Sequence, residues 1–275
     1  MQTITANGLN LPRLGLGTWR MAGAQCQQAV ESALALGYRH LDTSEMYGNE
    51  DAVGAGLAAS GVPRAEIHLT TKVWNDHLQP DRLRAAMATS LEKLRVGYVD
   101  LYLIHWPSPA MDLPAALETM MALQQEGKAR HIGVANFNVA LLRQAIEEVR
   151  APIAAHQFEF HATLRSPPLL GYMRAKGIPA IAYSPLAKGE LAQDETLGRI
   201  ARKHGATPAQ VAIGWLLDQE NVAAIPKSSR REGQKENLGA LDLRLDQTDR
   251  AAIEALPKGR RCVNPGFAPA WDKTG

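Results

Sequence analysis

The sequence predicts a (β/α)8 TIM barrel, and three observations support that fold class. Short apolar runs alternate with longer amphipathic segments about eight times, at the spacing of roughly thirty residues that a parallel barrel requires. The chain has 275 residues, of which 45% are hydrophobic, so it can fill one large core. No linker or low-complexity segment interrupts the pattern, so residues 1–275 are predicted to form a single domain.

Eight short apolar runs are predicted to be buried strands. They are Leu14–Gly17, His40–Asp42, Ile67–Val73, Val99–His105, Ala129–Ala135, Ile153–Phe158, Ile178–Tyr183 and Val222–Ile225. The segments between them carry apolar residues at helical spacing, such as Leu83, Met87 and Leu91. One later helix is predicted to begin at Thr207-Pro208, as its N-cap and first residue. A doubly wound open sheet is the alternative that the pattern alone leaves open.

The two ends of the chain differ from this alternating pattern. Residues Thr3–Arg13 form a strand-like pair around Asn7-Gly8, which predicts a β-hairpin placed to plug the bottom of the barrel. The tail from Gly259 contains Pro265 and Pro269 and is predicted to be irregular. We expect this tail to lie over the active-site end of the barrel.

Charge and composition argue against several classes of protein. The formal charge of +2 is too small to indicate binding to nucleic acid or to an anionic membrane. The N-terminus lacks a secretory signal, and no apolar stretch is long enough to cross a bilayer. The two cysteines, Cys26 and Cys262, are expected to be free thiols in a reducing cytoplasm. A cytoplasmic monomer that acts on a small molecule is therefore expected.

Three polar residues end successive early strands: Asp42, Lys72 and His105. Tyr47 follows five residues after Asp42. The strands of a parallel barrel all point the same way, so residues at their carboxyl ends converge where active sites form. Taken singly, each has a structural explanation: Asp42 as a helix cap, Lys72 as an exposed strand end, and His105 as a core histidine. Their shared spacing at strand ends favours a catalytic group.

The four side chains suit the reduction of a carbonyl. A free tyrosine has a pKa of about 10 and is a weak acid at neutral pH. We expect the Lys72 ammonium to lower the pKa of Tyr47, and Asp42 to keep the ammonium charged and in place. A neutral His105 can donate a hydrogen bond to the carbonyl oxygen. Together they can protonate the oxygen while a hydride reaches the carbon.

The sequence resembles the aldo-keto reductase family along essentially its whole length. The segments that carry the resemblance are GYRHLDTSEMYGNEDAVG (37–54), LTTKVW (69–74), DLYLIHWP (100–107), IGVANF (132–137), HQFEFH (156–161), AYSPLAKG (182–189) and IPKSS (225–229). The tail PGFAPAWD (265–272) also resembles the bacterial 2,5-diketo-D-gluconate reductase B group. The resemblance implies an NADPH-dependent reductase in which Tyr47 is the general acid, Lys72 lowers its pKa, Asp42 supports Lys72 and His105 orients the carbonyl.

The resemblance also implies which residues bind NADPH. They are Asn136, Gln157 and Tyr183 at the nicotinamide, Ser184, Leu186, Lys188 and Gly189 at the pyrophosphate, Lys227, Ser228 and Ser229 at the 2′-phosphate, and Glu236 and Asn237 at the adenine. Three positions depart from the family pattern: Ala135 for serine, Ala162 for proline, and Gly233 for an arginine that grips the 2′-phosphate. We expect Arg230 and Arg231 to replace that arginine.

Aromatic residues in loops after strands are predicted to line the substrate pocket. The candidates are Trp19, Tyr47, Trp74, His105, Trp106 and Phe137, with the tail closing one side. An apolar mouth with one polar corner suits aldehydes, 2-oxoaldehydes such as methylglyoxal, and ketones such as diketo-gluconate.

Three other functions compete with this prediction. A metal-dependent hydrolase could recruit His40, Asp42, His105, His156 and His161, but no compact ligand motif supports it. An NADPH-binding barrel with a regulatory or binding role stays open as the alternative to an enzyme. A Rossmann dehydrogenase is disfavoured because Gly15-Leu16-Gly17 lacks the third glycine.

Overall fold

The computed structural model describes residues 2–273 and contains one eight-stranded parallel sheet. Its strands, in chain order, are β3 (Leu16–Gly17), β4 (His40–Asp42), β5 (His68–Val73), β6 (Val99–Ile104), β7 (Ala129–Ala135), β8 (Ile153–Glu159), β9 (Ala180–Tyr183) and β10 (Val222–Ala224). Neighbours in the sheet are also neighbours in the sequence, from β3 to β10 without a reversal. A doubly wound sheet reverses its order at a switch point, so that alternative is wrong.

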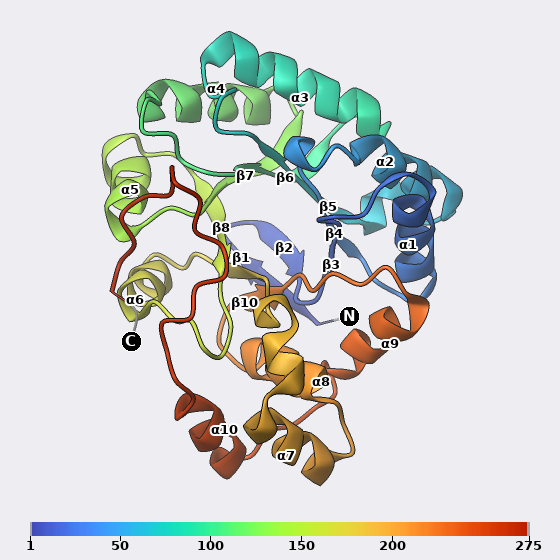
Figure 1. Cartoon of the computed structure of the whole chain (residues 1–275). Helices are drawn as coiled ribbons and strands as arrows, with labels where there is room; N and C mark the ends of the chain where they lie inside the picture. The colour runs from blue at the N-terminus through green and yellow to red at the C-terminus, as the bar shows by residue number, and fades with distance from the viewer. Residues whose placement is uncertain (1, 274–275) are drawn as a thin grey trace.

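The two edge strands of this sheet meet. A parallel bridge joins Leu14 to Ala224, and backbone hydrogen bonds run from Gly15 N to Ala224 O at 2.9 Å and from Ala224 N to Arg13 O at 2.8 Å. The sheet therefore curls back on itself. Figure 1 shows the strands at the centre with the helices arranged around them.

The helices lie between successive strands, as the alternating pattern predicts. Their bounds are α1 (Gly23–Ala35), α2 (Glu50–Ala59), α3 (Pro80–Leu94), α4 (Leu113–Gln125), α5 (Val139–Arg143) with a π-helical continuation (Gln144–Glu148), α6 (Pro167–Ala175), α7 (Glu195–His204), α8 (Pro208–Leu217), α9 (Arg231–Gly239) and α10 (Gln247–Glu254), with short 3-10 helices η1 (Glu45–Tyr47), η2 (Arg64–Glu66) and η4 (Ala187–Gln193). Thr207 caps α8 through a capping box and Pro208 is its first residue, so that predicted helix start is confirmed.

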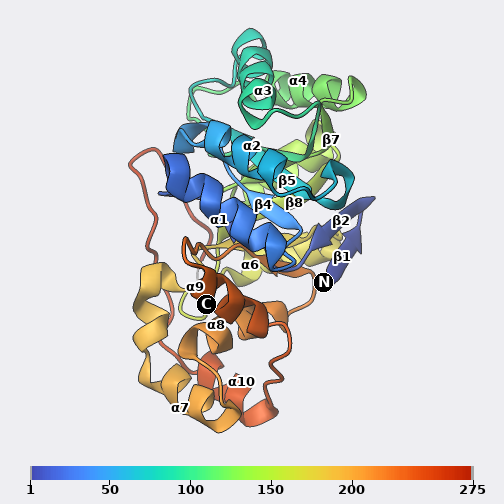
Figure 2. The ribbon, with the colours of Figure 1, turned by 90° about the vertical axis from the view of Figure 1, so that its right-hand side faces the viewer.

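The predicted N-terminal hairpin is present as β1 (Thr3–Ala6) and β2 (Leu9–Pro12). Its turn residues Asn7 and Gly8 both have positive φ, 50° and 76°, which a two-residue turn of this hand requires. The hairpin contributes apolar side chains to a core cluster that fills the inside of the sheet. In Figure 2 the hairpin and the tail lie on opposite sides of the molecule, so they cover opposite ends of the sheet.

All eight strand bounds agree with the prediction to within two residues, and the start of β9 shows why small differences arise. Ile178 was expected in the strand, but its N–H donates to Met173 O at 2.9 Å and completes the end of α6. Gly177, with a φ of 66°, makes the turn, so pairing begins only at Ala180. Among residues 2–273, no helix combines the length and the hydropathy that crossing a membrane requires.

Candidate active site

The structure brings Asp42, Lys72, His105 and Tyr47 together at the carboxyl ends of β4, β5 and β6. Asp42 is the last residue of β4, Lys72 lies one residue before the end of β5, and His105 directly follows β6. Tyr47 ends η1, the short helix that follows β4. Because these strands are parallel and adjacent, residues 30 or more positions apart in the chain become direct neighbours.

Lys72 is the centre of this cluster. Its side chain is completely buried, and its Nζ donates to Asp42 Oδ1 at 2.5 Å, Thr43 O at 2.7 Å and Tyr47 Oη at 3.4 Å. All three protons of the ammonium group therefore have a partner. Burial lowers the pKa of Lys72, and the neighbouring Asp42 charge opposes that shift by favouring the ammonium form.

The pKa of Tyr47 differs from the prediction. Burial of the hydroxyl raises its pKa well above 10, and the charge of Asp42 raises it further. Burial and the negative charge of Asp42 set the direction of the net shift, so the lowering effect of Lys72 stays a prediction. Tyr47 is consequently a protonated phenol throughout the neutral pH range, which is the form that can give a proton to a substrate oxygen.

His105 lies against Tyr47 with its ring almost perpendicular and the ring centres 5.6 Å apart, and Trp74 packs on it in the same way at 5.1 Å. Burial, followed by the Lys72 charge, lowers the pKa of His105 well below 6.5. The imidazole is therefore neutral at pH 7, as the sequence predicts. Its Nδ1 lies 2.9 Å from the Ser44 hydroxyl, while its Nε2 makes no hydrogen bond to the described residues.

The three residues that the resemblance assigns to the nicotinamide are connected to this cluster. Gln157 donates its side-chain amide to Asp42 Oδ2 at 2.7 Å, and Tyr183 donates its hydroxyl to Asn136 Oδ1 at 2.8 Å. Asn136 in turn donates to the backbone oxygen of His105 at 2.9 Å. The Asn136 oxygen and one of its two amide N–H groups are thus hydrogen-bonded within the protein, and the Gln157 oxygen makes no hydrogen bond to the described residues.

The residues assigned to the pyrophosphate lie in the segment after β9. Ser184 and Lys188 have positive φ values of 47° and 55°, and Leu186 and Gly189 belong to the same irregular turn. Lys188 is exposed, but its Nζ donates to Cys262 O at 2.7 Å, so its charge is directed toward the tail.

The residues assigned to the adenosine end follow β10. Lys227 and Arg230 are exposed, and α9 begins at Arg231 without a side-chain cap, so its first N–H groups are free. Ser228 and Ser229 are partly exposed between them. Of the residues assigned to the adenine, Glu236 accepts a hydrogen bond from the Thr207 hydroxyl at 2.7 Å, and Asn237 is buried.

Gly233 has a structural reason to lack a side chain. A Cβ at this position would lie 2.5 Å from Ser228 Oγ, and the Ser228 hydroxyl is held by Arg230 O at 3.0 Å. An arginine here would have to displace that serine.

The aromatic candidates for the substrate pocket fall into two groups. Trp19 is 45% exposed beside Tyr47, and Trp74 and Trp106 contact the tail residue Phe267 at ring distances of 5.8 Å and 5.7 Å. Trp106 also contacts Trp271 of the tail, at 5.9 Å. Phe137 is completely buried and packs in the hydrophobic core, so it does not face a pocket.

Glu159 fixes the start of the tail, and the sequence analysis did not assign it a role. This completely buried carboxylate accepts the backbone N–H groups of Cys262 at 2.6 Å and Val263 at 2.9 Å. His161 Nε2 lies 3.1 Å from the same carboxylate. The sequence signal that could have identified Glu159 is its spacing, because Gln157, Glu159 and His161 alternate along one strand and its extension.

Glu159, His161 and Cys262 also form the one group of three potential metal ligands that residues 2–273 bring within 4.8 Å. Of the five ligands considered for a metal-dependent hydrolase, only His161 belongs to it. His156, another of the five, lies in β8 and accepts the Phe137 N–H through its Nε2.

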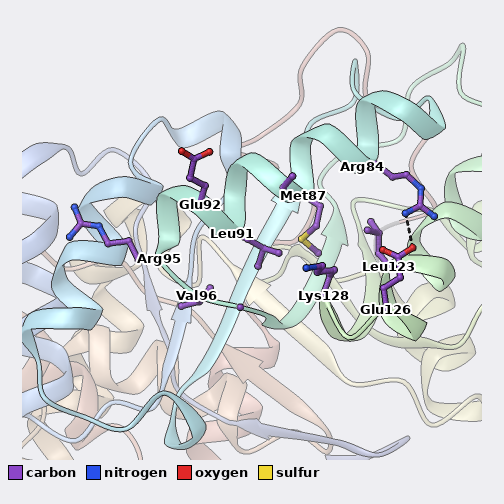
Figure 3. Close-up of a pocket in the computed structure, with 11 residues that line it drawn as sticks. Arg84, Met87, Leu91, Glu92, Arg95, Val96, Leu123, Glu126 and Lys128 are labelled. Atoms are coloured by element: carbon purple, nitrogen blue, oxygen red, sulfur yellow. Dashed lines mark hydrogen bonds and ion pairs between the residues drawn. The ribbon is translucent and has the colours of Figure 1, made fainter.

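Two hollows on the surface lie outside the polar cluster or at its border. One of about 480 Å³ lies between α3 and α4, with Met87, Leu91 and Leu123 on its floor and the Arg84–Glu126 ion pair across it (Figure 3). None of the predicted site residues lines it. A second, of about 510 Å³, borders the cluster at Trp74 and Glu45, whose carboxylate accepts the Trp74 N–H.

The fold and the polar cluster correspond to a known class of enzyme. A family model for the aldo/keto reductase family matches residues 13–258. The chain therefore belongs to the aldo/keto reductase family.

Several individual members of the family are similar to it. Methylglyoxal reductase DkgB of Salmonella typhimurium is 43% identical over 268 residues, which cover 96% of this chain and 100% of that protein. Glyoxal reductase of Bacillus subtilis is 40% identical over 93% of this chain and 92% of its own length. The crystal structure of a candidate 2,5-diketo-D-gluconic acid reductase B superposes with a TM-score of 0.96 at 40% identity, covering 99% of this chain and 98% of that one.

Proposed function

We propose that this chain is an NADPH-dependent reductase of small aldehydes, 2-oxoaldehydes and ketones. The observation that carries the proposal is the buried ammonium of Lys72, which contacts both Asp42 and the Tyr47 hydroxyl. A buried charge pair is costly to desolvate and is weak evidence for stability, so its presence at a strand end favours a chemical use. In this proposal the whole chain is one (β/α)8 barrel domain that acts as a monomer in the cytoplasm.

Tyr47 is the proposed proton donor. When hydride reaches the carbonyl carbon, the C=O π electrons move to oxygen, and the Tyr47 O–H gives its proton to that oxygen to form the alcohol. The forming alkoxide is a much stronger base than a phenolate, so a phenol with a raised pKa can still protonate it. Lys72 then stabilises the phenolate through its 3.4 Å contact until water returns a proton.

The residues present fit NADPH. The cofactor supplies the hydride, and the free Gln157 oxygen, the Tyr183 ring and the amide of Asn136 lie beside the cluster to hold and face the nicotinamide ring. Lys227 and Arg230 supply positive charge, and the uncapped start of α9 supplies free N–H groups. A 2′-phosphate is bound by both kinds of group. Ser228, Ser229 and Arg231 extend this group.

The proposed pocket is an aromatic mouth above one polar corner. Trp19, Trp74 and Trp106 surround the Tyr47–His105 corner, and the tail closes one side through Phe267. Such a lining suits small carbonyl compounds, and the names of the relatives, methylglyoxal reductase and glyoxal reductase, point to 2-oxoaldehydes. Methylglyoxal and a diketo-gluconate are the first substrates to try.

A screen of NADPH oxidation tests the proposal. Purified protein is assayed with methylglyoxal, a reactive aromatic aldehyde and a diketo sugar acid, and NADPH binding is measured in parallel by fluorescence. Turnover of at least one carbonyl is expected. Binding without turnover of any of them would instead favour the regulatory or binding role.

Cofactor choice is tested separately at Lys227. We expect NADPH to be preferred over NADH by roughly tenfold or more, since a charge-assisted phosphate contact contributes about 1.5–3 kcal/mol. Lys227→Ala should raise the apparent KM for NADPH and leave that for NADH unchanged, as measured by kcat/KM for both cofactors at fixed ionic strength. Glu232→Ala, at an exposed acidic position in the first turn of the following helix α9, is the control. Equal use of both cofactors by the wild type would show that this loop does not recognise the phosphate.

A further inference from the structure

Ser44 contacts the proposed carbonyl-binding histidine from behind. Its hydroxyl lies 2.9 Å from His105 Nδ1 and 3.3 Å from Lys72 O, and it accepts the Met46 N–H at 3.4 Å. Ser44 is completely buried and His105 is 7% exposed. The three atoms around the hydroxyl are thus fixed by η1 and by the strand ends on either side of it.

The hydroxyl has one proton and two acceptors within reach, so it cannot donate to both. If it donates to His105 Nδ1, the single proton of the neutral imidazole must be on Nε2. If it donates to Lys72 O, it accepts a proton from Nδ1, and Nε2 then carries a lone pair. The Ser44 hydroxyl is therefore coupled to the tautomer of His105.

The distances favour the first arrangement. In the first arrangement the Ser44 proton lies in the contact with Nδ1, which has the length of an ordinary hydrogen bond. In the second arrangement it would lie in the contact with Lys72 O, which is long for a hydroxyl donor. We propose, on the basis of the reductase function above, that Ser44 is a positioning residue that donates to His105 Nδ1 and thereby keeps a proton on Nε2.

The consequence concerns the substrate oxygen. Nε2 makes no hydrogen bond to the described residues, so it is free to reach the carbonyl. With a proton on Nε2, His105 donates to the carbonyl oxygen and stabilises the charge that develops there. With a lone pair on Nε2, the same ring repels the oxygen. The Ser44 hydrogen bond thus determines whether His105 stabilises or repels the charge on the substrate oxygen. Ser44 itself does not contact the substrate.

The ring tautomer can be measured directly with ¹⁵N-labelled histidine. The two ring nitrogens of His105 are assigned by comparison with His105→Gln, and their ¹⁵N shifts show which one carries the proton. We expect the wild type and Ser44→Thr to have the proton on Nε2. In Ser44→Ala nothing donates to Nδ1, and the shifts should move toward those of an exchanging mixture.

Activity gives a second measurement. The kcat/KM of Ser44→Ala should fall about fivefold, the size expected for one ordinary hydrogen bond, with unchanged NADPH affinity. Ser44→Thr should restore most of it. Ser90→Ala is the matched control, because it removes a buried hydroxyl that donates to Glu50 at 3.1 Å, away from His105.

A wild-type ring protonated on Nδ1 would overturn the proposal, and so would identical ring shifts in Ser44→Ala and the wild type. If Ser44→Ala does not fold, the spectra of the wild type and Ser44→Thr still decide. The tautomer is measured without turnover. A protein that fails to reduce carbonyls can therefore be distinguished from one in which Ser44 does not set the tautomer.

Discussion

Strands β4 and β5 carry buried polar side chains at both of their ends, and the two ends are partnered differently. At the carboxyl end, Asp42 and Lys72 form an ion pair in which both groups are hydrogen-bonded. At the amino end, His40 and His68 meet edge to face with ring centres 4.9 Å apart. His40 Nδ1 contacts the hairpin at Pro12 O, but the Nε2 atoms of both histidines make no hydrogen bond within residues 2–273.

The comparison predicts that the carboxyl end of these strands carries out chemistry and that the amino end serves packing. Burial lowers the pKa of His40 and of His68, so the amino end holds neutral rings that pack beneath the hairpin. The carboxyl end instead retains full charges in a buried place, where they cost desolvation energy. Substitutions at the carboxyl end should therefore remove activity, and substitutions at the amino end should change stability and its dependence on pH.

The largest effect is expected for Lys72→Met. This change removes the cation beside Tyr47 and leaves Asp42 as an unpaired buried charge. We expect kcat/KM to fall by more than about 10²-fold and the free energy of unfolding to drop by about 3–5 kcal/mol. Urea unfolding and carbonyl reduction are the two measurements, with the exposed Lys93→Met as control. Normal turnover by Lys72→Met would show that the ion pair at the carboxyl ends of β4 and β5 is not required for activity.

Tyr47→Phe should reduce activity without the loss of stability. It keeps the ring against Trp19 and His105 and removes the proton donor, so carbonyl reduction should fall by at least about 10²-fold. NADPH affinity should change little. Steady-state kinetics and fluorescence titration test this, and Tyr172→Phe, at a half-buried tyrosine on α6, is the control. A mutant with near wild-type kcat would identify another proton donor.

Asp42→Asn should be milder than Lys72→Met. An amide oxygen can still accept from Lys72, but its NH₂ group then faces the Gln157 amide, which has to turn over to present its oxygen. We expect a loss of about tenfold in kcat/KM, the size of one or two hydrogen bonds, together with weaker NADPH binding. If Asp42→Asn proved more damaging than Lys72→Met, the central role of the lysine would be wrong.

At the amino end, His68→Leu tests the pH dependence of stability. The unfolded chain protonates histidine below about pH 6.5, whereas the buried ring stays neutral, so acid favours unfolding. Stability is thus fully present above pH 6.5 and is lost as the pH falls below it.

Removing this one histidine should lessen the loss of unfolding free energy between pH 7 and pH 5 by about 2 kcal/mol. Activity at pH 7 should stay within about twofold of the wild type, because the substitution is at the packing end. Urea unfolding at both pH values is the measurement. An unchanged slope with pH would mean that His68 is accessible to protons in the folded chain.

The arrangement of elements follows from the sequence because each strand is a short apolar run and each helix an amphipathic one. The polar cluster follows as well, because parallel strands bring their last residues together, and Asp42, Lys72 and His105 lie at the ends of three neighbouring strands. Sequence spacing does not report burial, however. The net direction of the Tyr47 pKa shift was therefore not predictable, since burial and the charge of Asp42 both raise it.

Side chains that act through hydrogen bonds to the backbone were also difficult to recognise. Ser44 and Glu159 contact main-chain atoms of segments that are distant in sequence, and such contacts leave no residue pattern in the partner segment. Phe137 shows the opposite error. Its place after β7 suggested a pocket residue, but the loop turns its ring into the core.

The attachment of the tail has a consequence for how this enzyme could change over time. Glu159 holds the segment by main-chain N–H groups of Cys262 and Val263, which every residue except proline provides. The side chains farther along, Phe267 and Trp271, are therefore free to vary while the segment stays attached. Mutation at these two positions can therefore change the aromatic contacts with Trp74 and Trp106 without removing the hydrogen bonds that attach the tail.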